Sequence, residues 1–361
     1  MENWRLLDLG KAEPYKAQTF YEAVAEAVDR GSSPNTLILV QPASPYACIG
    51  YHQDLEKEID LEFTEAHGLP VIRRSQGGGA TYLDGGQVFY QTVSRDSAVL
   101  PRGVDRLFEK ALSVTVEGYR RLGVAAEFKP LNDVVVGGRK ISGNGAGMHG
   151  SATILVGNYI MDLDYQRMAG VLRVPDEKFR DKMAKSMEQW VTTLRRELGE
   201  SPPPERIKEV HAEAFQELLG VTLTPGEPTE TERRIYAEET LPRHTGREWL
   251  YMEAPCGRPG RAVKIAHDVK VVEADHKAGK LIRLRAEVKG TEILDLQITG
   301  DLFVIPKEAV GKLEAALVGA HLEERELLEK VAGFYEEKGP ESPGVSPKDY
   351  VDALMKLRTL L

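Results

Sequence analysis

The sequence has few cysteines and no pattern that would pair them. Only two occur among its 361 residues, Cys48 and Cys256, and neither belongs to a CxxC motif. This excludes a disulfide scaffold and a cysteine-based zinc site, and it fits a reducing compartment. Cys48 lies in the apolar stretch YACIGY, which favours a small core residue over a nucleophile. Cys256 lies in a Pro/Gly loop without a nearby histidine, which also argues against a nucleophile.

The chain also lacks a long apolar run, a leader segment and a net positive charge. Its longest strongly apolar stretch, residues 152–161, is far shorter than the ~18 residues of a membrane span. The first residues, MENWRLLDLGKAEPYK, do not have the basic and then apolar layout of a signal peptide. A net charge of −9 argues against general nucleic-acid binding but leaves room for a local basic pocket. We therefore expect a cytoplasmic protein that binds neither membranes nor nucleic acid.

What is present is a globular composition with 42% hydrophobic and 29% charged residues. Apolar periodicity predicts helices over residues 15–30, 104–122, 175–199 and 205–219, and strands over 36–42, 69–75 and 152–164. Residues 133–145 predict a strand, a tight turn and a second strand. Residues 81–94 predict a hairpin that turns at Asp84-Gly85-Gly86. Because strands and helices do not alternate regularly, an α+β fold on a mixed or antiparallel sheet is favoured over a doubly wound sheet.

The length of the chain suggests two domains, and its composition changes where they would meet. Residues 1–220 form the first predicted domain. The polar, proline-bearing stretch 221–245 is interpreted as a linker. Residues 246–361 predict a small α+β domain with an antiparallel sheet followed by helices at about 306–318, 322–337 and 347–359.

Two glycine-rich segments carry cationic side chains. In RRSQGGGATYLDGG, residues 73–86, Arg73 and Arg74 precede the triplet Gly77–Gly79, and in GGRKISGNG, residues 137–145, the cations are Arg139 and Lys140. Glycine triplets are tolerated mainly where the backbone turns sharply or approaches another group closely. If the two segments converge, they form a cationic cradle with bare backbone N–H groups for phosphate or carboxylate. The alternative is a loose glycine turn with solvated arginines.

Other local patterns are less specific. Gly145-Ala-Gly147-Met-His-Gly150 matches GxGxxG, but the following SATILVGNYI is strand-like, so no helix is available to bind a pyrophosphate and a dinucleotide-binding fold is rejected. No P-loop motif occurs. Asn132 and Asp133 are candidates for ordering a base or holding Mg²⁺, or they cap a turn. No histidine shows metal-ligand spacing, so His149 is expected to be structural or to donate a hydrogen bond.

Together these segments resemble the lipoate–protein ligase branch of the biotin/lipoate ligase family. RRSQGGGATYLDGG, NDVVVGGRKISGNG and HGSATIL follow one another at the spacing of that family, and ASPYACIGYHQDLEKEID resembles its early segment. The C-terminal KAGKLIRLRAEVKGTEILDLQITGDLFVIP and GVSPKDYVDAL resemble its accessory domain. The resemblance implies a catalytic domain over residues 1–220 fused to an accessory domain over 246–361.

The resemblance implies a two-step reaction that uses ATP and Mg²⁺. Lipoate or octanoate would become an acyl-adenylate, and the acyl group would then pass to a lysine of a lipoyl carrier protein. Lys140 would be catalytic and contact both the acyl carbonyl and the α-phosphate. The implied lipoate-binding residues are Arg73, Gly77, Gly78, Gly79, Ala80 and His149. The implied nucleotide-binding residues are Arg74, Tyr82, Asn132, Asp133, Lys140 and Gly143, with Asp133 also a ligand of Mg²⁺.

The chain departs from the family pattern at Gln76, Leu83 and Gln87, where many relatives carry Ser or Thr, His, and Asn. Two alternatives therefore remain. One is an octanoyl or lipoyl transferase, which needs no ATP and uses a cysteine thioester; the other is a degenerate lipoate-binding protein. A biotin ligase is rejected because no GRGR-type loop occurs. The implied carrier is an H-protein-like domain, a dehydrogenase E2 domain, or a lipoate-binding protein of sulfur oxidation.

Overall fold

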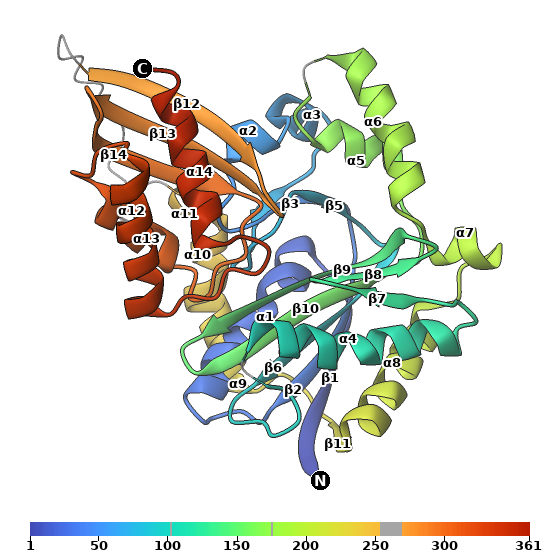
Figure 1. The fold of residues 1–361 in the computed structure, drawn as a ribbon. Helices are drawn as coiled ribbons and strands as arrows, with labels where there is room; N and C mark the ends of the chain where they lie inside the picture. The colour runs from blue at the N-terminus through green and yellow to red at the C-terminus, as the bar shows by residue number, and fades with distance from the viewer. Residues whose placement is uncertain (102, 175, 253–268) are drawn as a thin grey trace. The chain divides into compact units, whose positions relative to one another are not determined.

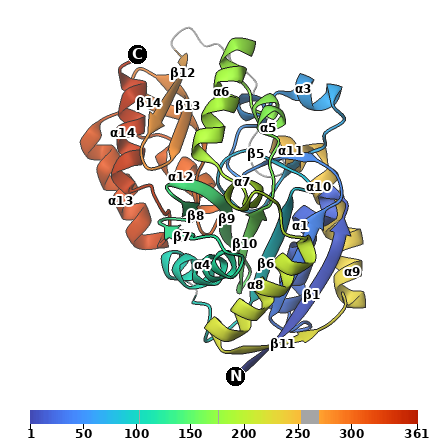
Figure 2. The same cartoon turned by 90° about the vertical axis from the view of Figure 1, so that its right-hand side faces the viewer.

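The computed structural model describes residues 1–101, 103–174, 176–252 and 269–361 (Figures 1 and 2). They divide into two compact units. Unit 1 comprises residues 1–49, 56–74 and 80–250, and unit 2 comprises residues 50–55, 75–79 and 251–361. Cys256 lies outside the described residues. Within the described part of the chain, no helix has both the length and the hydropathy that a membrane span requires.

Unit 1 is built on an eight-stranded mixed sheet with the strand order β11-β1-β2-β6-β10-β9-β8-β7. The strands pair parallel across β11, β1 and β2 and antiparallel from β2 onward. Their bounds are β1 Glu2–Ala12, β2 Thr36–Pro42, β6 Gln87–Ser94, β7 Glu127–Lys129, β8 Asp133–Val136, β9 Arg139–His149, β10 Ala152–Ile160 and β11 Val221–Pro225. The expected α+β fold on a mixed sheet is thereby confirmed.

Helices cover both faces of this sheet. Successive side chains of a strand point to opposite faces. On β6, Tyr90 stacks on His211 of α8 (Pro204–Leu219), while the next residue, Gln91, donates to the carbonyl of Ala17 in α1 (Pro14–Asp29). Helix α4 (Val104–Arg121) packs beside α8, so α4 and α8 cover one face and α1 covers the other (Figure 1).

A second, three-stranded sheet in unit 1 corrects the predicted hairpin. Its order is β4-β3-β5, with bounds β3 Tyr46–Ile49, β4 Val71–Arg73 and β5 Thr81–Leu83. The turn at residues 84–86 is present, but β5 pairs with β3, whereas β6 pairs with β2 and β10 in the large sheet. The two strands separate because each finds a buried partner elsewhere in the chain.

The remaining predicted elements of unit 1 form close to their expected positions. Residues 145–149 of the GxGxxG stretch lie in β9 and pair with β10, and Gly150 lies in the turn between the two strands, which confirms that no nucleotide-binding helix follows it. The predicted helix at 175–199 is interrupted at residues 191–193, where Val191 forms a bridge with Lys140. The shorter helices are α2 Leu55–Glu58, α3 Leu61–Ala66, α5 Tyr165–Val171, α6 Glu177–Trp190 and α7 Leu194–Leu198.

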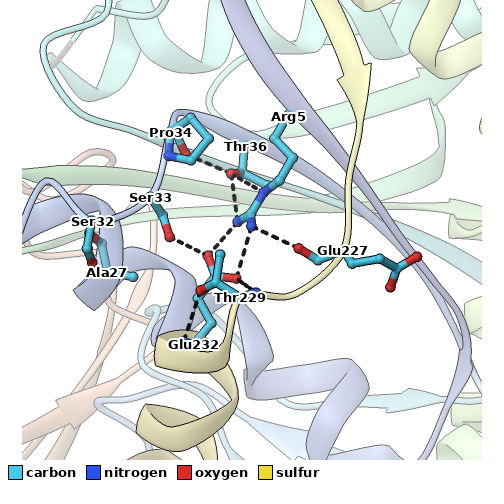
Figure 3. Close-up of polar contacts among 9 residues, drawn as sticks. All are labelled: Arg5, Ala27, Ser32, Ser33, Pro34, Thr36, Glu227, Thr229 and Glu232. Atoms are coloured by element: carbon cyan, nitrogen blue, oxygen red, sulfur yellow. Dashed lines mark hydrogen bonds and ion pairs between the residues drawn. The ribbon is translucent and has the colours of Figure 1, made fainter.

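The stretch 221–245, which the sequence predicted as a linker, is folded. It forms β11, α9 (Glu230–Ile235), a π-helical segment η1 (Tyr236–Thr240) and α10 (Leu241–Thr245), and α11 (Arg247–Tyr251) follows. A buried ion pair fixes α9, because Arg5 of β1 donates to both carboxylate oxygens of Glu232 (Figure 3). Ser33 donates to the same carboxylate, and Thr229 and Glu232 form a capping box at the start of α9.

The described part of unit 2 contains the predicted antiparallel sheet and three helices. The strands are β12 Val269–Lys277, β13 Leu281–Lys289 and β14 Glu292–Gly300, and the helices are α12 Ala309–Leu317, α13 Glu324–Lys338 and α14 Pro347–Arg358. Alternate residues of β13 (Ile282, Leu284, Ala286 and Val288) are buried in one apolar cluster with side chains of the three helices. The sheet therefore has its own hydrophobic core.

Candidate functional site

Lys140 and Asp133 form an ion pair across the β8–β9 hairpin. Lys140 lies near the start of β9, directly after a turn in which Gly137 and Gly138 have positive φ values. The Lys140 Nζ lies 2.7 Å from Asp133 Oδ1, and the two side chains are 38% and 31% exposed. Because both groups keep contact with solvent, the pair can open and offer a cation to an incoming anion at little cost.

Gly143 leaves space beside this lysine. A Cβ at position 143 would lie 3.3 Å from Lys140 Cε and 3.6 Å from its Nζ, so a side chain there would require the lysine to shift by a few tenths of an ångström. The Gly143 N–H donates to Asn158 Oδ1 at 2.8 Å, and Asn158 Nδ2 donates to Gln87 Oε1 at 2.9 Å. Asn158 was not predicted as a site residue; a polar residue within an otherwise apolar strand is the signal that could have found it.

Asn132 is held by a second residue that sequence reasoning missed, Asn144. Asn132 Nδ2 donates to the Asn144 carbonyl at 2.6 Å, and Asn144 Nδ2 donates to the Asn132 carbonyl at 3.0 Å. The Tyr90 hydroxyl donates to Asn144 Oδ1. Asp133 follows Asn132 directly and lies opposite Gly143. The two amides thus close the open end of the hairpin next to the Lys140–Asp133 pair.

Arg73 is buried and joins β4 to α11. Its Nε and Nη2 donate to the carbonyl oxygen of Leu250 at 3.0 and 2.7 Å. Its own carbonyl accepts from His244 Nδ1 and from Trp249 Nε1, both at 2.9 Å. The Arg73 guanidinium therefore connects two elements of unit 1. The prediction that Arg73 binds lipoate did not include this contact.

Arg74, which directly follows β4, lies beside Cys48 of β3. Arg74 Nη1 is 3.6 Å from Cys48 Sγ. The thiol is fully buried, and burial raises its pKa although Arg74 opposes that shift. Cys48 therefore stays protonated at neutral pH and packs in an apolar cluster with Val40, Ile72 and Leu83. The prediction that Cys48 is a core residue is confirmed.

The glycine triplet packs tightly within unit 2. A Cβ at Gly77 would overlap the Leu302 carbonyl, and the Gly78 N–H donates to that carbonyl at 3.1 Å. A Cβ at Gly50 would overlap the Gly78 carbonyl in the same way. The glycine triplet therefore approaches another group closely, as the sequence predicted. In the structure that group is the backbone at Leu302 and Gly50.

The last predicted residues lie at strand ends of unit 1. Tyr82 of β5 is buried, and burial together with Asp84 raises the pKa of its phenol. Ala80 precedes β5 and is half-buried. His149, at the end of β9, contacts Glu26 of α1 through Nε2. Burial raises the pKa of Glu26, but His149 and Arg30 outweigh burial and the net pKa is lowered.

Among the predicted site residues, the structure thus brings Lys140, Asp133 and Gly143 together, with Asn132 adjacent to them. Arg73, Arg74 and His149 contact other elements of unit 1. No group of three His, Cys, Asp or Glu side chains converges on a metal within the described ranges. The single carboxylate of Asp133 suits a Mg²⁺ ion that is bound mainly by phosphate and water.

Comparisons with known proteins agree with this arrangement. A family model described as the lipoyl protein ligase A/B catalytic domain matches residues 13–216. The chain is 32% identical to octanoyltransferase LipM of Kyrpidia tusciae over 70% of this chain and 99% of that protein. It is 26% identical to lipoate-protein ligase LplJ of Bacillus subtilis over 80% of this chain and 82% of that one.

A solved structure supports the same assignment. The chain superposes on a structure of the bi-partite lipoate protein ligase system of Thermoplasma acidophilum with a TM-score of 0.61 and 26% identity, over 73% of this chain and 100% of that chain. The shared chemistry is lipoyl or octanoyl ligation or transfer to a protein. The chain belongs to the lipoyl protein ligase A/B catalytic domain family.

Proposed function

We propose that this chain is an ATP-dependent lipoate–protein ligase that forms an acyl-adenylate and transfers the acyl group to a lysine of a lipoyl carrier domain. The observation that carries the proposal is the Lys140–Asp133 pair, a partly exposed cation that passes beside the bare backbone of Gly143. A carboxylate and an α-phosphate repel each other as anions, so their reaction requires a cation that can contact both.

In the first step, a carboxylate oxygen of lipoate attacks the α-phosphorus of ATP. The bond from the α-phosphorus to the bridging oxygen breaks, and pyrophosphate leaves with the electron pair. Lys140 stabilises the negative charge that accumulates on the α-phosphate, while Asp133 holds the ammonium until the anions arrive. We assign Arg74, Tyr82, Asn132 and Gly143 to the nucleotide. Asp133 would hold a Mg²⁺ ion, which would supply positive charge to the phosphates of ATP.

In the second step, the amine of a carrier lysine attacks the acyl carbonyl of the adenylate. An amide forms, the mixed anhydride bond breaks, and AMP leaves. No covalent enzyme intermediate is required. This agrees with the state of Cys48, whose buried thiol has a raised pKa and is a poor nucleophile.

A second candidate is a transferase that takes an octanoyl group from one carrier and needs no ATP. The observation that favours it is the 32% identity of the chain to octanoyltransferase LipM of Kyrpidia tusciae. By the family resemblance such an enzyme needs a cysteine thioester. Cys48 is buried, so this candidate depends on Cys256, the only other cysteine of the chain.

One experiment separates the two candidates. Pyrophosphate release from ATP is measured with lipoate, with octanoate and with neither, in the absence of carrier. The ligase releases pyrophosphate only when an acid is present. A transferase releases none but moves an octanoyl group from octanoylated carrier to apo-carrier without ATP, and intact-mass measurement detects its acyl-thioester. A protein that binds lipoate and performs neither reaction would be a degenerate binding protein, which contradicts the proposal.

A further inference from the structure

Helix α6 exposes two large aromatic side chains. Trp190 is 67% and Phe179 is 48% exposed. The sequence positions 179, 182, 186 and 190 follow one another at intervals of three or four residues, so they share one face of a helix. Lys182 and Ser186, which lie between the aromatic residues on this face, are exposed as well. We call Phe179, Lys182, Ser186 and Trp190 the α6 face.

The end of α6 is attached to the strand that carries Lys140. Directly after Trp190, Val191 forms a bridge with Lys140, and the Thr192 N–H donates to the Lys140 carbonyl at 2.8 Å. The hydroxyl of Tyr165 also donates to the carbonyl of Val191 at 3.0 Å. Trp190 is therefore one residue away from a segment that is paired with the candidate site.

The other end of α6 is fastened to α3. Arg180 pairs with Asp60 at 2.5 Å and lies over the Phe63 ring at 5.5 Å. Ala184 is the helix residue that is completely buried. These contacts fix the helix at both ends on the side away from the α6 face, so its aromatic residues are exposed although the helix itself is anchored.

We propose that the α6 face is the docking surface for the acceptor lipoyl domain. The proposal rests on the transfer of an acyl group to a carrier lysine, a step that the ligase and the transferase share. A carrier must bring its lysine to the site that contains Lys140, and the α6 face begins one residue from the segment that pairs with that strand. Exposed aromatic side chains at such a position are typical of protein-binding hot spots.

The charge of this face specifies its partner. Lys182 lies on it and is exposed, whereas the exposed Lys185 lies between Asp181, four residues before it, and Glu188, three residues after it. The α6 face thus carries one charge, the cation of Lys182, on a chain with a net charge of −9. It fits a carrier domain whose surface beside the target lysine is acidic, because complementary charges raise the association rate.

Tryptophan fluorescence reports docking independently of the chemistry. The chain has three tryptophans, and Trp4 and Trp249 are only 1% and 8% exposed. The apo-lipoyl domain that the enzyme modifies fastest is titrated against the full-length protein. We expect a blue shift of the emission and protection from acrylamide quenching on binding. Both changes should disappear in Trp190→Phe.

Kinetics separate docking from a role in substrate activation. Trp190→Ala and Phe179→Ala should each raise the KM for the lipoyl domain on the order of tenfold. Adenylate formation without carrier should stay within twofold of the unmodified protein. Lys182→Glu should raise the same KM and weaken its dependence on salt. The matched controls are Leu218→Ala, an exposed apolar residue of α8, and Lys110→Glu, an exposed lysine of α4, and neither should change the KM.

Three results would overturn the proposal. The first is unchanged Trp190 emission at a carrier concentration that saturates acyl transfer. The second is loss of adenylate formation in Trp190→Ala and Phe179→Ala with an unchanged KM for carrier, because the face would then cover the small substrates. The third is sedimentation showing that these variants abolish self-association instead. If wild-type protein makes no adenylate yet the emission shifts on carrier binding, the ligase assignment fails and the docking surface stands.

Discussion

At the scale of single residues, Lys140 combines partial exposure with a defined partner. Its ammonium group pairs with Asp133 across the hairpin and passes beside the bare backbone of Gly143. A partly exposed cation can exchange the Asp133 carboxylate for a substrate anion without leaving a buried charge unpaired. This property distinguishes Lys140 from the buried Arg73. We therefore expect folding of the protein not to depend on Lys140.

We expect Lys140→Ala to abolish adenylate formation and leave the fold intact. Loss of a cation that stabilises the transition state should slow the first step by at least about a hundredfold. Pyrophosphate release with lipoate measures the rate, and circular dichroism with a thermal melt measures the fold. Arg139→Ala, which removes a neighbouring cation that pairs with Glu197 instead, is the control. A near wild-type rate in Lys140→Ala would remove Lys140 from the mechanism.

The two cysteines are expected to be dispensable for activity. Cys48→Ala removes one buried sulfur atom and should cost about 1 kcal/mol of unfolding free energy. The double variant Cys48→Ala, Cys256→Ala should still ligate lipoate, since no thiolate takes part in the proposed reaction. Activity is measured by the mass of the lipoylated carrier. Complete loss of acyl transfer in Cys256→Ala alone would establish the transferase instead.

At the scale of elements, the glycine triplet shows that neighbouring glycines serve different purposes. Gly77→Ala should destabilise unit 2 strongly, because its Cβ would overlap the Leu302 carbonyl. Gly79→Ala is the matched control, since the nearest atom to its Cβ is a side-chain oxygen of Asp301 at 3.5 Å. We expect the free energy of unfolding to fall by at least about 3 kcal/mol in Gly77→Ala and by less than about 1 kcal/mol in Gly79→Ala. Thermal unfolding measures both losses. Equal losses would show that backbone contact does not explain the triplet.

The segment containing α9 depends on a charge that is buried. Burial raises the pKa of Glu232, but its contacts with Arg5, Thr229 and Ser33 together lower the pKa by more. The net pKa therefore lies below its usual value of 4.5. A lowered pKa in the folded state stabilises the protein above the pKa of the unfolded chain, and this stabilisation is lost as the pH falls through the folded value.

We therefore expect the effect of Glu232→Gln on stability to depend on pH. At pH 7 the substitution should lower the free energy of unfolding by about 2–4 kcal/mol, because Arg5 remains charged and buried. The difference from the wild type should shrink below about pH 4.5, as measured by melts across that range. Glu329→Gln, which removes an exposed pair with Arg325, should change little at any pH. A pH-independent difference for Glu232→Gln would show that the carboxylate is not charged in the fold.

Local pattern was sufficient for elements whose environment is set by their own residues. The strand at 36–42 contains the apolar run 37–40, and the helix at 104–122 has one continuous apolar face, so both formed as predicted. It was insufficient for β5 and β6, whose partners lie far away in the sequence. The Lys140–Asp133 pair follows from a predicted hairpin. The contacts of Arg73 with Leu250 and of Gly78 with Leu302 could not be predicted, because nothing local specifies either partner.

At the scale of the whole molecule, the chain leaves unit 1 for unit 2 after Ile49, after Arg74 and after Leu250. Arg73 bonds to Leu250, so the last two exits are fastened together within unit 1. This changes where the chain can be cut. A boundary at residue 245, as the sequence suggested, removes α11 and leaves the Arg73 guanidinium buried without Leu250.

Two truncations test this junction. The chain 1–252 should unfold about 6–12 °C above the chain 1–245, because breaking the buried contact costs about 3 kcal/mol. Differential scanning fluorimetry measures both chains. Introducing Arg73→Met into each should reduce the difference, since no buried charge then remains. A difference that persists in the Arg73→Met pair would assign the effect to the hydrophobic packing of α11.

The assembly of unit 2 from three separate stretches has a consequence for its biosynthesis. His52 leaves the ribosome 248 residues before Gly300 and Gly78 leaves it 224 residues before Leu302, the residues whose backbone each bonds. At roughly 5–20 residues per second, the glycine segment waits about 10–45 s for its partner. During this interval the nascent protein presents an unpaired, flexible loop to chaperones and proteases. Gly300 and Leu302 therefore complete a structure that translation began more than 220 residues earlier.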